Sequence, residues 1–474
     1  MLTHFRWNFV YLSVFFISIT ASHKSQAARL SLQEFLQNAI KNNTQFAALK
    51  SLEEAAKLTQ EKGDIELTPM LSLKMGIMDD KKPTLQPNFQ GDHTQAKQIQ
   101  LGVAKKFSTG TALQVQMLHN WAQISGTTFP LPTYWSPALS IGFSQSLWKD
   151  FLGRQTQIRR DRENAQEKLQ SLVHALSGLQ LLFAMEQSYW NHIFYVQDLR
   201  IKKESLLRAQ KLKTWMARRV NNGLADRNDL LQVEALEGAR MLQLITAEDE
   251  YQASIKTLEL SMGQSLAGFE IPSSFPSSDN FDIPKDFLRI DVLIQQRESQ
   301  MRSYVVKETI EATKPELNLA GSASTNAQKS TLAGSFGGLL ATDKPTYILG
   351  IELKIDLDSR SKNAIKNSAL AESTAAVQKL SHGLIEGQIQ REELLRRAND
   401  LNVRIQTVEK LLKIHAEKSA REKDRLERGR TVTFQVINFE QEHSESEVLL
   451  LKLQSEKQKL LASRRLFVSE NFGD

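Results

Sequence analysis

The sequence predicts a mainly α-helical, internally duplicated fold that also carries a β portion, and three observations support this prediction. Two very long stretches contain no proline, and they run up to the glycines at Gly223 and Gly429. Short segments ahead of each stretch alternate apolar and polar residues, which is typical of strands. The same order of strand-like segment, long helix, glycine turn and second helix occurs twice, which indicates an internal repeat.

The first proline-free stretch predicts one continuous helix from Trp148 to Asn222. Its apolar residues are spaced by four and three positions, as in a coiled coil; they are Ala165, Leu169, Leu172, Leu176, Leu179 and Phe183. At 1.5 Å per residue this helix would be roughly 110 Å long, too long for a compact domain. A glycine that can adopt a left-handed backbone follows at Gly223, so the chain is expected to turn back there.

Aligning the two glycines supports the duplication. The pair Leu230-Leu231 then falls on Val436-Ile437, and Glu234 falls on Glu440, without a gap. We therefore predict a first repeat over 28–262, with strands at about 69–147 and a helical hairpin turning at 223. A linker follows over 263–286. The second repeat spans 287–474, with strands at about 315–357 and a turn at 429.

Residues 1–27 have the features of a secretory signal peptide. Arg6 precedes an apolar run from Trp7 to Thr20, and Ser25-Gln26-Ala27 forms a small-x-small cleavage site. The run is shorter than the roughly 20 residues that a membrane-spanning helix needs. We expect cleavage and export, with a retained anchor as the alternative.

Six segments alternate with a period of two, which is many for a helical protein. They lie at 71–77, 99–103, 113–117, 139–143, 317–319 and 347–357. A small sandwich and a membrane barrel both fit this pattern. Aromatic residues at segment ends and long polar loops favour the barrel; the aromatic residues are Trp121, Tyr134, Trp135 and Trp148. Because so few strands cannot enclose a channel, the barrel would be shared within a cyclic oligomer.

No motif points to catalysis or to a bound cofactor. The chain has no cysteine, no zinc-binding His pattern, no phosphate-binding glycine loop and no nucleophile elbow. The net charge of +6 is spread as alternating signs along the helices, which argues against a nucleic-acid surface. We expect a protein that is not an enzyme and that needs no cofactor or metal.

Several short motifs in a fixed order give the chain a family resemblance. They are Leu30-Ser31-Leu32 with Ala39 and Asn42-Asn43, Pro69 and Pro315, Ser144-Gln145-Ser146-Leu147, and the glycine turns with Asp229-Leu230-Leu231 and Glu234. With these motifs the chain resembles the TolC-like outer membrane factors, the exit ducts of tripartite efflux pumps and type I secretion systems. The resemblance covers essentially all of the mature chain.

The resemblance implies a homotrimer in the outer membrane. It implies a transmembrane β-barrel of twelve strands, four per chain, continued by a long coiled-coil α-helical barrel in the periplasm. The implied partners are a periplasmic adaptor, an inner-membrane pump and outer membrane lipid. The family's proline at the junction of strand and helix is Ser146 here and Asp356 in the second repeat. A pair of segments at 97–106 and 111–119 exceeds the four-strand pattern, and its place stays open.

The resemblance also implies functional residues. Charges flank both turns and would form a periplasmic gate, at Asp226, Asp229, Arg428 and Arg430. Ordinary placement of charges at helix ends explains them equally well. Where many members carry an aspartate at the entrance, this chain has Gln435. The turn glycines Gly223 and Gly429 would be the docking tips for the adaptor. A lipid-facing strand would carry Leu349, Ile351, Leu353 and Ile355.

Two functions are therefore weighed. The first is a passive export duct gated by its adaptor. The second is a secreted periplasmic or surface coiled-coil scaffold or adhesin, whose strands form a soluble cap. Extraction behaviour separates them, because a duct needs detergent and a scaffold is released by osmotic shock.

Overall fold

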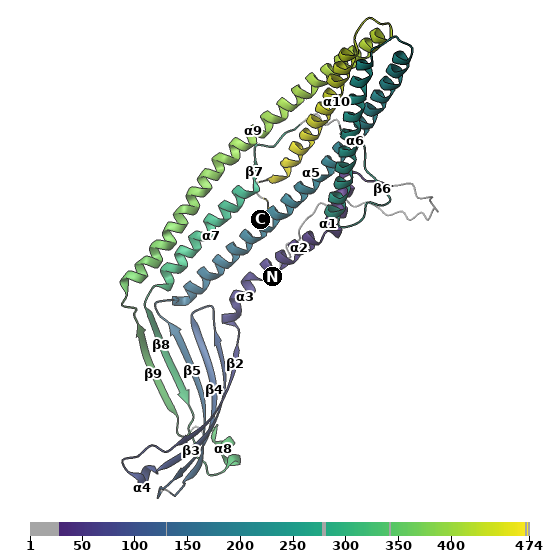
Figure 1. Ribbon diagram of the computed structural model, residues 1–474. Helices are drawn as coiled ribbons and strands as arrows, with labels where there is room; N and C mark the ends of the chain where they lie inside the picture. The colour runs from purple at the N-terminus through teal and green to yellow at the C-terminus, as the bar shows by residue number, and fades with distance from the viewer. Residues whose placement is uncertain (1–27, 129, 277–280, 341–342, 470–471, 473–474) are drawn as a thin grey trace, which may run out of the picture. The chain divides into compact units, whose positions relative to one another are not determined.

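The computed structural model describes residues 28–128, 130–276, 281–340, 343–469 and 472 (Figure 1). The predicted signal peptide, 1–27, lies outside these residues. The chain divides into two compact units, and segments from both predicted repeats contribute to each. The first unit combines the chain up to Asn43 with Met185–Ser277 and Thr407–Ser455. The second combines Thr44–Ala184, Ser278–Gln406 and the chain from Glu456.

The first unit is helical. It contains α1 (Leu32–Asn42), the later part of α5 (Arg154–Asn221), α6 (Arg227–Met262), the end of α9 (Ser359–Glu427) and most of α10 (Thr433–Ala462). A capping box begins α1, because Ser31 accepts from the backbone of Glu34 while Glu34 accepts from the Ser31 N–H. The short strands β1 (Ala28–Arg29) and β6 (Phe269–Glu270) pair in parallel. Helix α1 ends at Asn42, and Asn43 is its C-cap residue.

The second unit joins helices to a large sheet. Its helical elements are α2 (Thr44–Lys57), α3 (Thr59–Gly63), η1 (Asp64–Leu67), α7 (Ile290–Ala312) and the first parts of α5 and α9. A small core of Leu172, Ile290, Leu293 and Val468 connects α5 and α7 with the antiparallel pair β7 (Phe287–Arg289) and β10 (Phe467–Ser469). This core therefore joins elements from distant parts of the sequence.

Over the described residues, the large sheet has six strands in the order β2-β3-β4-β5-β8-β9, each antiparallel to its neighbours (Figure 1). The strands are β2 (Met70–Asp80), β3 (His93–Lys106), β4 (Thr111–Ser125), β5 (Thr133–Ser146), β8 (Glu316–Ser324) and β9 (Thr346–Lys354). All six alternating segments are strands of this sheet. The implied four strands per chain are wrong for this protein, because the 97–119 pair adds β3 and β4 between β2 and β5.

The sheet is open in the described chain, with β2 and β9 at its edges, and no closed barrel forms within it. One predicted boundary is also wrong. The alternation predicts a strand throughout 347–357, but β9 ends at Lys354, so Ile355 lies beyond it. The residues after Lys354 lead into α9, whose first turn is capped by Asp358: its carboxylate accepts from the backbone N–H groups of Arg360 and Ser361.

Candidate functional site

One face of the large sheet is apolar on every strand. The register places Leu73, Leu101, Met117 and Leu139 side by side across four strands. On β9, Leu349, Ile351 and Leu353 pair with Gly321, Leu319 and Leu317 of β8, which continues the same face. Most of these side chains are exposed; Ile351 is 70% exposed and Ile77 is 84% exposed. Such a continuous exposed apolar surface marks contact with a membrane or a partner.

The opposite face of the sheet is mostly polar. A row of Ser72, Gly102, Gln116 and Ser140 crosses β2, β3, β4 and β5. The hydroxyls in this row donate to neighbouring backbone carbonyls, Ser72 to Gly102 at 3.4 Å and Ser140 to Gln116 at 3.4 Å. One apolar and one hydrated face is the pattern of a sheet that separates lipid from water.

Cations and aromatic rings lie at both ends of the apolar face. At the loop end, the Lys97 ammonium lies 5.2 Å from the ring centroid of Trp121, and Trp121 pairs with Trp135. At the helix end, Lys105 lies 5.2 Å from the ring centroid of Phe107. From Lys97 to Lys105 the strand rises by about 27 Å. This length matches an apolar band of about 25 Å when the strands tilt only slightly, and it decreases with a steeper tilt.

The predicted aromatic positions divide between the two faces. Trp121 and Trp135 lie on the apolar face near the loops, as a girdle requires. Tyr134 pairs with Ala122 on the polar face, so it cannot belong to the same girdle. Trp135 also stacks on His119, which contacts Phe336 of α8 (Leu332–Gly338) at a centroid distance of 5.1 Å. The short helix α8 therefore packs on the loop end of β4 and β5.

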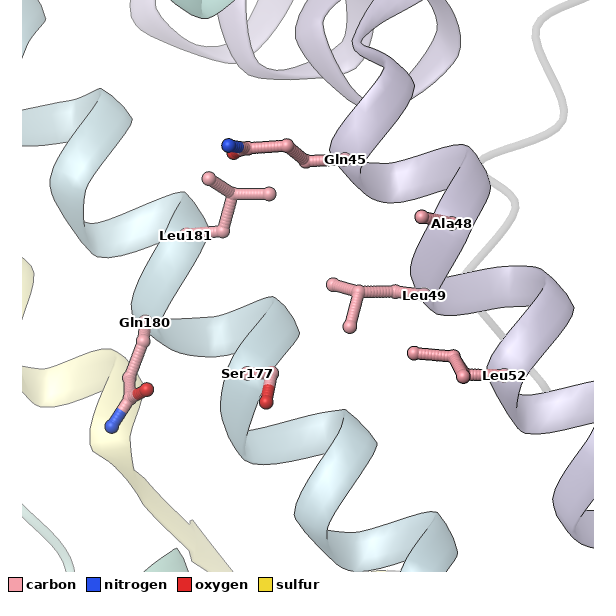
Figure 2. A pocket seen from close by; sticks show the side chains of 7 residues that line it. All are labelled: Gln45, Ala48, Leu49, Leu52, Ser177, Gln180 and Leu181. Carbon is pink, nitrogen blue, oxygen red and sulfur yellow. The ribbon is translucent and has the colours of Figure 1, made fainter.

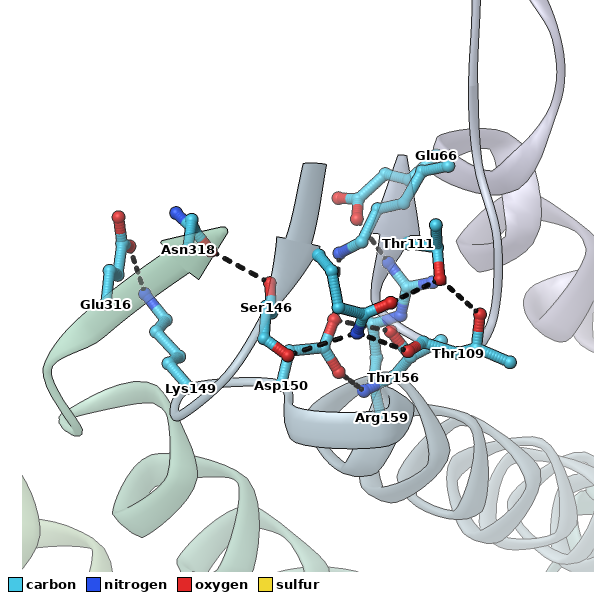
Figure 3. Close-up of polar contacts among 12 residues, drawn as sticks. Glu66, Thr109, Thr111, Ser146, Lys149, Asp150, Thr156, Arg159, Glu316 and Asn318 are labelled. Atoms are coloured by element: carbon cyan, nitrogen blue, oxygen red, sulfur yellow. Dashed lines mark hydrogen bonds and ion pairs between the residues drawn. The ribbon is translucent and has the colours of Figure 1, made fainter. Parts of the chain in front are cut away.

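The junction of β5 with α5 is a compact polar cluster that the sequence did not reveal (Figure 3). Asp150 and Leu152 have positive φ angles of 61° and 49°, and Gly153 follows at 78°. The buried Asp150 carboxylate accepts from the backbone N–H of Thr156 at 3.0 Å and pairs with Lys106 at 3.1 Å. The start of the continuous helix predicted from Trp148 is therefore wrong, because α5 begins only at Arg154. The η2 turn (Phe151–Gly153) precedes it, five to seven residues beyond Ser146. Gly153, which lies in a charged stretch, was the one feature of the sequence that indicated this turn.

The two predicted turns have the same backbone geometry. Gly223 and Gly429 each have a φ of 71°. The N–H of Leu224 donates to Arg219 at 2.8 Å, and the N–H of Arg430 donates to Arg425 at 2.9 Å, the six-residue bond of a Schellman motif. A left-handed glycine at these two positions is therefore confirmed. The exposed apolar side chains close to the turns are Leu224, Leu231, Val432 and Phe434.

Both helical hairpins meet in one core near the turns. The cluster contains Leu212 and Met216 of α5, Val233 of α6, Leu426 of α9 and Val436 of α10. Charged contacts extend this packing. Arg208 pairs with Glu440 across α5 and α10, Lys213 pairs with Glu237 at 2.7 Å, and Lys418 pairs with Glu442 at 2.8 Å. The alignment of the two repeats with each other identified Glu440 only as the counterpart of Glu234.

The predicted gate charges do not pair with one another within the described chain. Asp226 caps α6 by accepting from the N–H of Asn228 at 2.9 Å, and Asp229 lies in the first turn of the same helix. Arg428 pairs with Asp424 of its own helix at 2.9 Å. The Arg430 carbonyl accepts from Arg425 at 3.4 Å.

A buried histidine in the first unit is expected to make its stability depend on pH. His192 of α5 is 5% exposed, and its Nδ1 lies 2.8 Å from the Ser254 hydroxyl of α6. Burial lowers the pKa of His192 to about 4. An unfolded histidine has a pKa of about 6.5, so the unfolded chain binds more protons between these values, and stability falls as the pH drops from about 6.5 towards 4.

We expect about 1 kcal/mol of this stability to be lost per chain between pH 7.5 and 5.5. The effect is measured as the change in thermal midpoint of the detergent-solubilised protein by circular dichroism. His192→Gln should reduce the pH dependence, whereas His382→Gln, at a site whose side chain is 80% exposed, should leave it unchanged. Equal pH profiles for the wild type and His192→Gln would contradict the assignment.

Neither the surface groove nor the groups of charged side chains in the described residues form a site for catalysis or for a metal ion. An open groove of about 440 Å³ lies between α2 and α5, and its lining residues are apolar, hydroxyl or amide side chains (Figure 2). In the described part of the chain, no group of three His, Asp or Glu side chains is placed to hold a metal ion. No helix of these residues is both long enough and apolar enough to cross a membrane.

Solved structures match this fold over nearly all of the chain. The outer membrane protein VceC of Vibrio cholerae aligns with a TM-score of 0.70 at 14% identity, covering 92% of this chain and 95% of VceC. The CmeC channel of Campylobacter jejuni aligns with a TM-score of 0.71 at 13% identity, covering 96% and 93%. The open state of the MtrE channel of Neisseria gonorrhoeae gives 0.64 at 14%, covering 98% and 97%.

No protein-family model matches the sequence, and no curated protein does. The chain nevertheless has the fold of solved outer membrane channels such as CmeC and MtrE. More narrowly, it is the fold of a TolC-like outer membrane factor, so the predicted resemblance is confirmed for the fold.

Proposed function

We propose that this protein is the outer membrane channel of a tripartite efflux or type I secretion system. It acts as a passive exit duct: the sheet lies in the outer membrane as a barrel shared by three copies, and the helices project into the periplasm. The observation that carries the proposal is the sheet with one continuous exposed apolar face and one polar face. In water the apolar side chains of this face would stay hydrated, which is unfavourable. Lipid removes these side chains from water.

Fractionation and reconstitution test this function. The protein should need detergent for extraction from the outer membrane, migrate as a trimer and form channels in planar bilayers. Release by osmotic shock, with no channel activity, would instead favour the secreted scaffold or adhesin. The signal peptide over 1–27 and the repeats over 28–262 and 287–474, joined by the linker 263–286, belong to the same proposal.

The turns at Gly223 and Gly429 are proposed to dock a periplasmic adaptor that couples the duct to an inner-membrane pump. The exposed apolar side chains near both turns support this role, because they leave a surface that a partner can cover. Gly223→Trp or Gly429→Trp should weaken adaptor binding by about tenfold or more, equivalent to about 1.4 kcal/mol, measured by biolayer interferometry with the purified trimer. Export should fall accordingly.

A matched control is available on α6. Gly238 is exposed, a Cβ added there would meet no atom within 4 Å, and its backbone is not left-handed. Gly238→Trp should bind the adaptor normally. Normal binding by both turn variants would remove the turns from the docking surface.

The charges at the turns are proposed to hold the resting aperture closed through contacts between copies. Asp229→Ala or Arg430→Ala should then raise the single-channel conductance. Removing these exposed ion pairs should destabilise the closed state relative to the open state by about 1–2 kcal/mol, summed over three chains. High salt should have the same effect on the wild type, since it screens exposed charges. Unchanged conductance in both variants and in high salt would place the constriction elsewhere.

A further inference from the structure

We propose that the β3–β4 hairpin is part of the membrane wall, and that three copies of this chain close a barrel of eighteen strands. This inference rests on the proposed function, because it takes the trimer and the membrane sheet as given. Over the described residues, each chain supplies six strands to the large sheet, whereas the family resemblance implies four. Barrel diameter grows about linearly with strand number, so this barrel would be about one and a half times as wide as a twelve-stranded one.

The strand register supports a wall position for the hairpin. Pairing between β3 and β4 is continuous from His93 with Ser125 to Lys106 with Ala112. Val103, Val115 and Ile141 form one apolar row through the hairpin into β5. A one-residue shift would have moved these side chains to the polar face. The hairpin therefore extends both faces of the wall without a break.

The turn of the hairpin is also built into the junction between sheet and helix (Figure 3). The Gly110 carbonyl accepts from the N–H of Ser146 at 3.2 Å. A Cβ at Gly153 would lie 1.6 Å from the Ser108 carbonyl oxygen, and one at Gly110 would lie 2.4 Å from that of Asp150. The two glycines thus allow the hairpin turn to pack directly against the start of α5. A loosely attached accessory hairpin would not need this close backbone packing.

The edges of the sheet explain how copies could join. Every described residue of β9 is exposed, and so is nearly all of β2. Six strands are fewer than the eight of the smallest membrane barrels, and open edges are not tolerated in lipid, so closure requires further copies. Because neighbours alternate in direction, β2 and β9 run opposite ways, and β9 of one copy can pair antiparallel with β2 of the next.

Spin labels on single cysteines test the wall position, since the native chain has no cysteine. Val115→Cys on β4 and Ile141→Cys on β5 sample the apolar face, while Gln116→Cys and Ser140→Cys sample the polar face at paired positions. In phosphatidylcholine vesicles, labels at 115 and 141 should relax more with molecular oxygen. Labels at 116 and 140 should relax more with a water-soluble nickel chelate.

The outcomes separate the hairpin from the channel. If 115 behaves like 116 while 141 and 140 keep their contrast, the hairpin lies outside the wall and the eighteen-stranded barrel is wrong. If 141 and 140 show no contrast either, the sheet is not in the membrane, and the proposed function fails together with this inference.

Disulfide trapping counts the copies. Lys74→Cys combined with Glu352→Cys or with Gly350→Cys places thiols on the polar faces of β2 and β9. One of these pairs should yield disulfide-linked oligomers on denaturing gels, and the largest of them should be a closed trimer. Lys74→Cys with Ile351→Cys should not, because the two side chains lie on opposite faces. A ladder that ends at another copy number, or no product from either polar pair, would overturn the count of eighteen.

Discussion

Ile351→Arg should strongly reduce the amount of assembled protein in the outer membrane. Ile351 lies in the middle of β9, is 70% exposed and shares the apolar face with Leu319 of β8. An arginine on the lipid face near the bilayer midplane costs about 2–4 kcal/mol per chain. Since three chains would carry the charge, assembly should suffer more than the single-chain value suggests. The measurement is trimer yield in outer membrane extracts on mildly denaturing gels.

Gly350→Arg is the matched control. It adds the same side chain one position earlier on the same strand, on the polar face, where no atom lies within 4 Å of the new Cβ. Its trimer yield should stay near that of the wild type. Equal loss in the two variants would mean that the apolar face of β9 does not contact lipid.

Gly153→Ala should destabilise the junction between β5 and α5 and detach the β3–β4 turn. The backbone at Gly153 has a φ of 78°, and an added Cβ would overlap the Ser108 carbonyl oxygen at 1.6 Å. A left-handed backbone costs an L-residue about 1–2 kcal/mol, and overpacking adds about 1–3 kcal/mol. We expect a loss of about 2–5 kcal/mol, measured from the midpoint of urea unfolding of the detergent-solubilised protein.

Gly223→Ala separates these two contributions. Gly223 has nearly the same φ of 71°, but nothing lies within 4 Å of its added Cβ. It should therefore cost only the backbone term of about 1–2 kcal/mol. If both alanine variants unfold at the same midpoint, the contact between the hairpin turn and the start of α5 contributes nothing to stability.

The parts of the fold that depend on local patterns could be predicted from the sequence. The absence of proline and the spacing of apolar residues predicted α5 and α9, and the glycines predicted both turns. Alternation predicted all six strands of the large sheet. These features are local. A helix forms its backbone hydrogen bonds within its own segment, and successive side chains of a strand point to opposite faces.

Features that depend on pairing between distant residues were not predictable. The place of the β3–β4 hairpin depends on which strands lie beside it, and alternation is the same for any neighbour. Asp150 was not recognised because its role comes from Lys106 and Thr156, one of which lies far away in sequence. The pair of Arg208 with Glu440 joins residues 232 positions apart.

The sequence by itself therefore determined the long helices, the glycine turns and the set of strands, since each follows from short-range sterics and periodicity. Only the tertiary structure decided that the apolar residues of all six alternating segments fall on one face of a single sheet. That result needs the register of every strand pair, which backbone hydrogen bonds and the packing of turns such as Gly110 against Asp150 fix together. It is this register that gives the sheet one face suited to lipid and one suited to water.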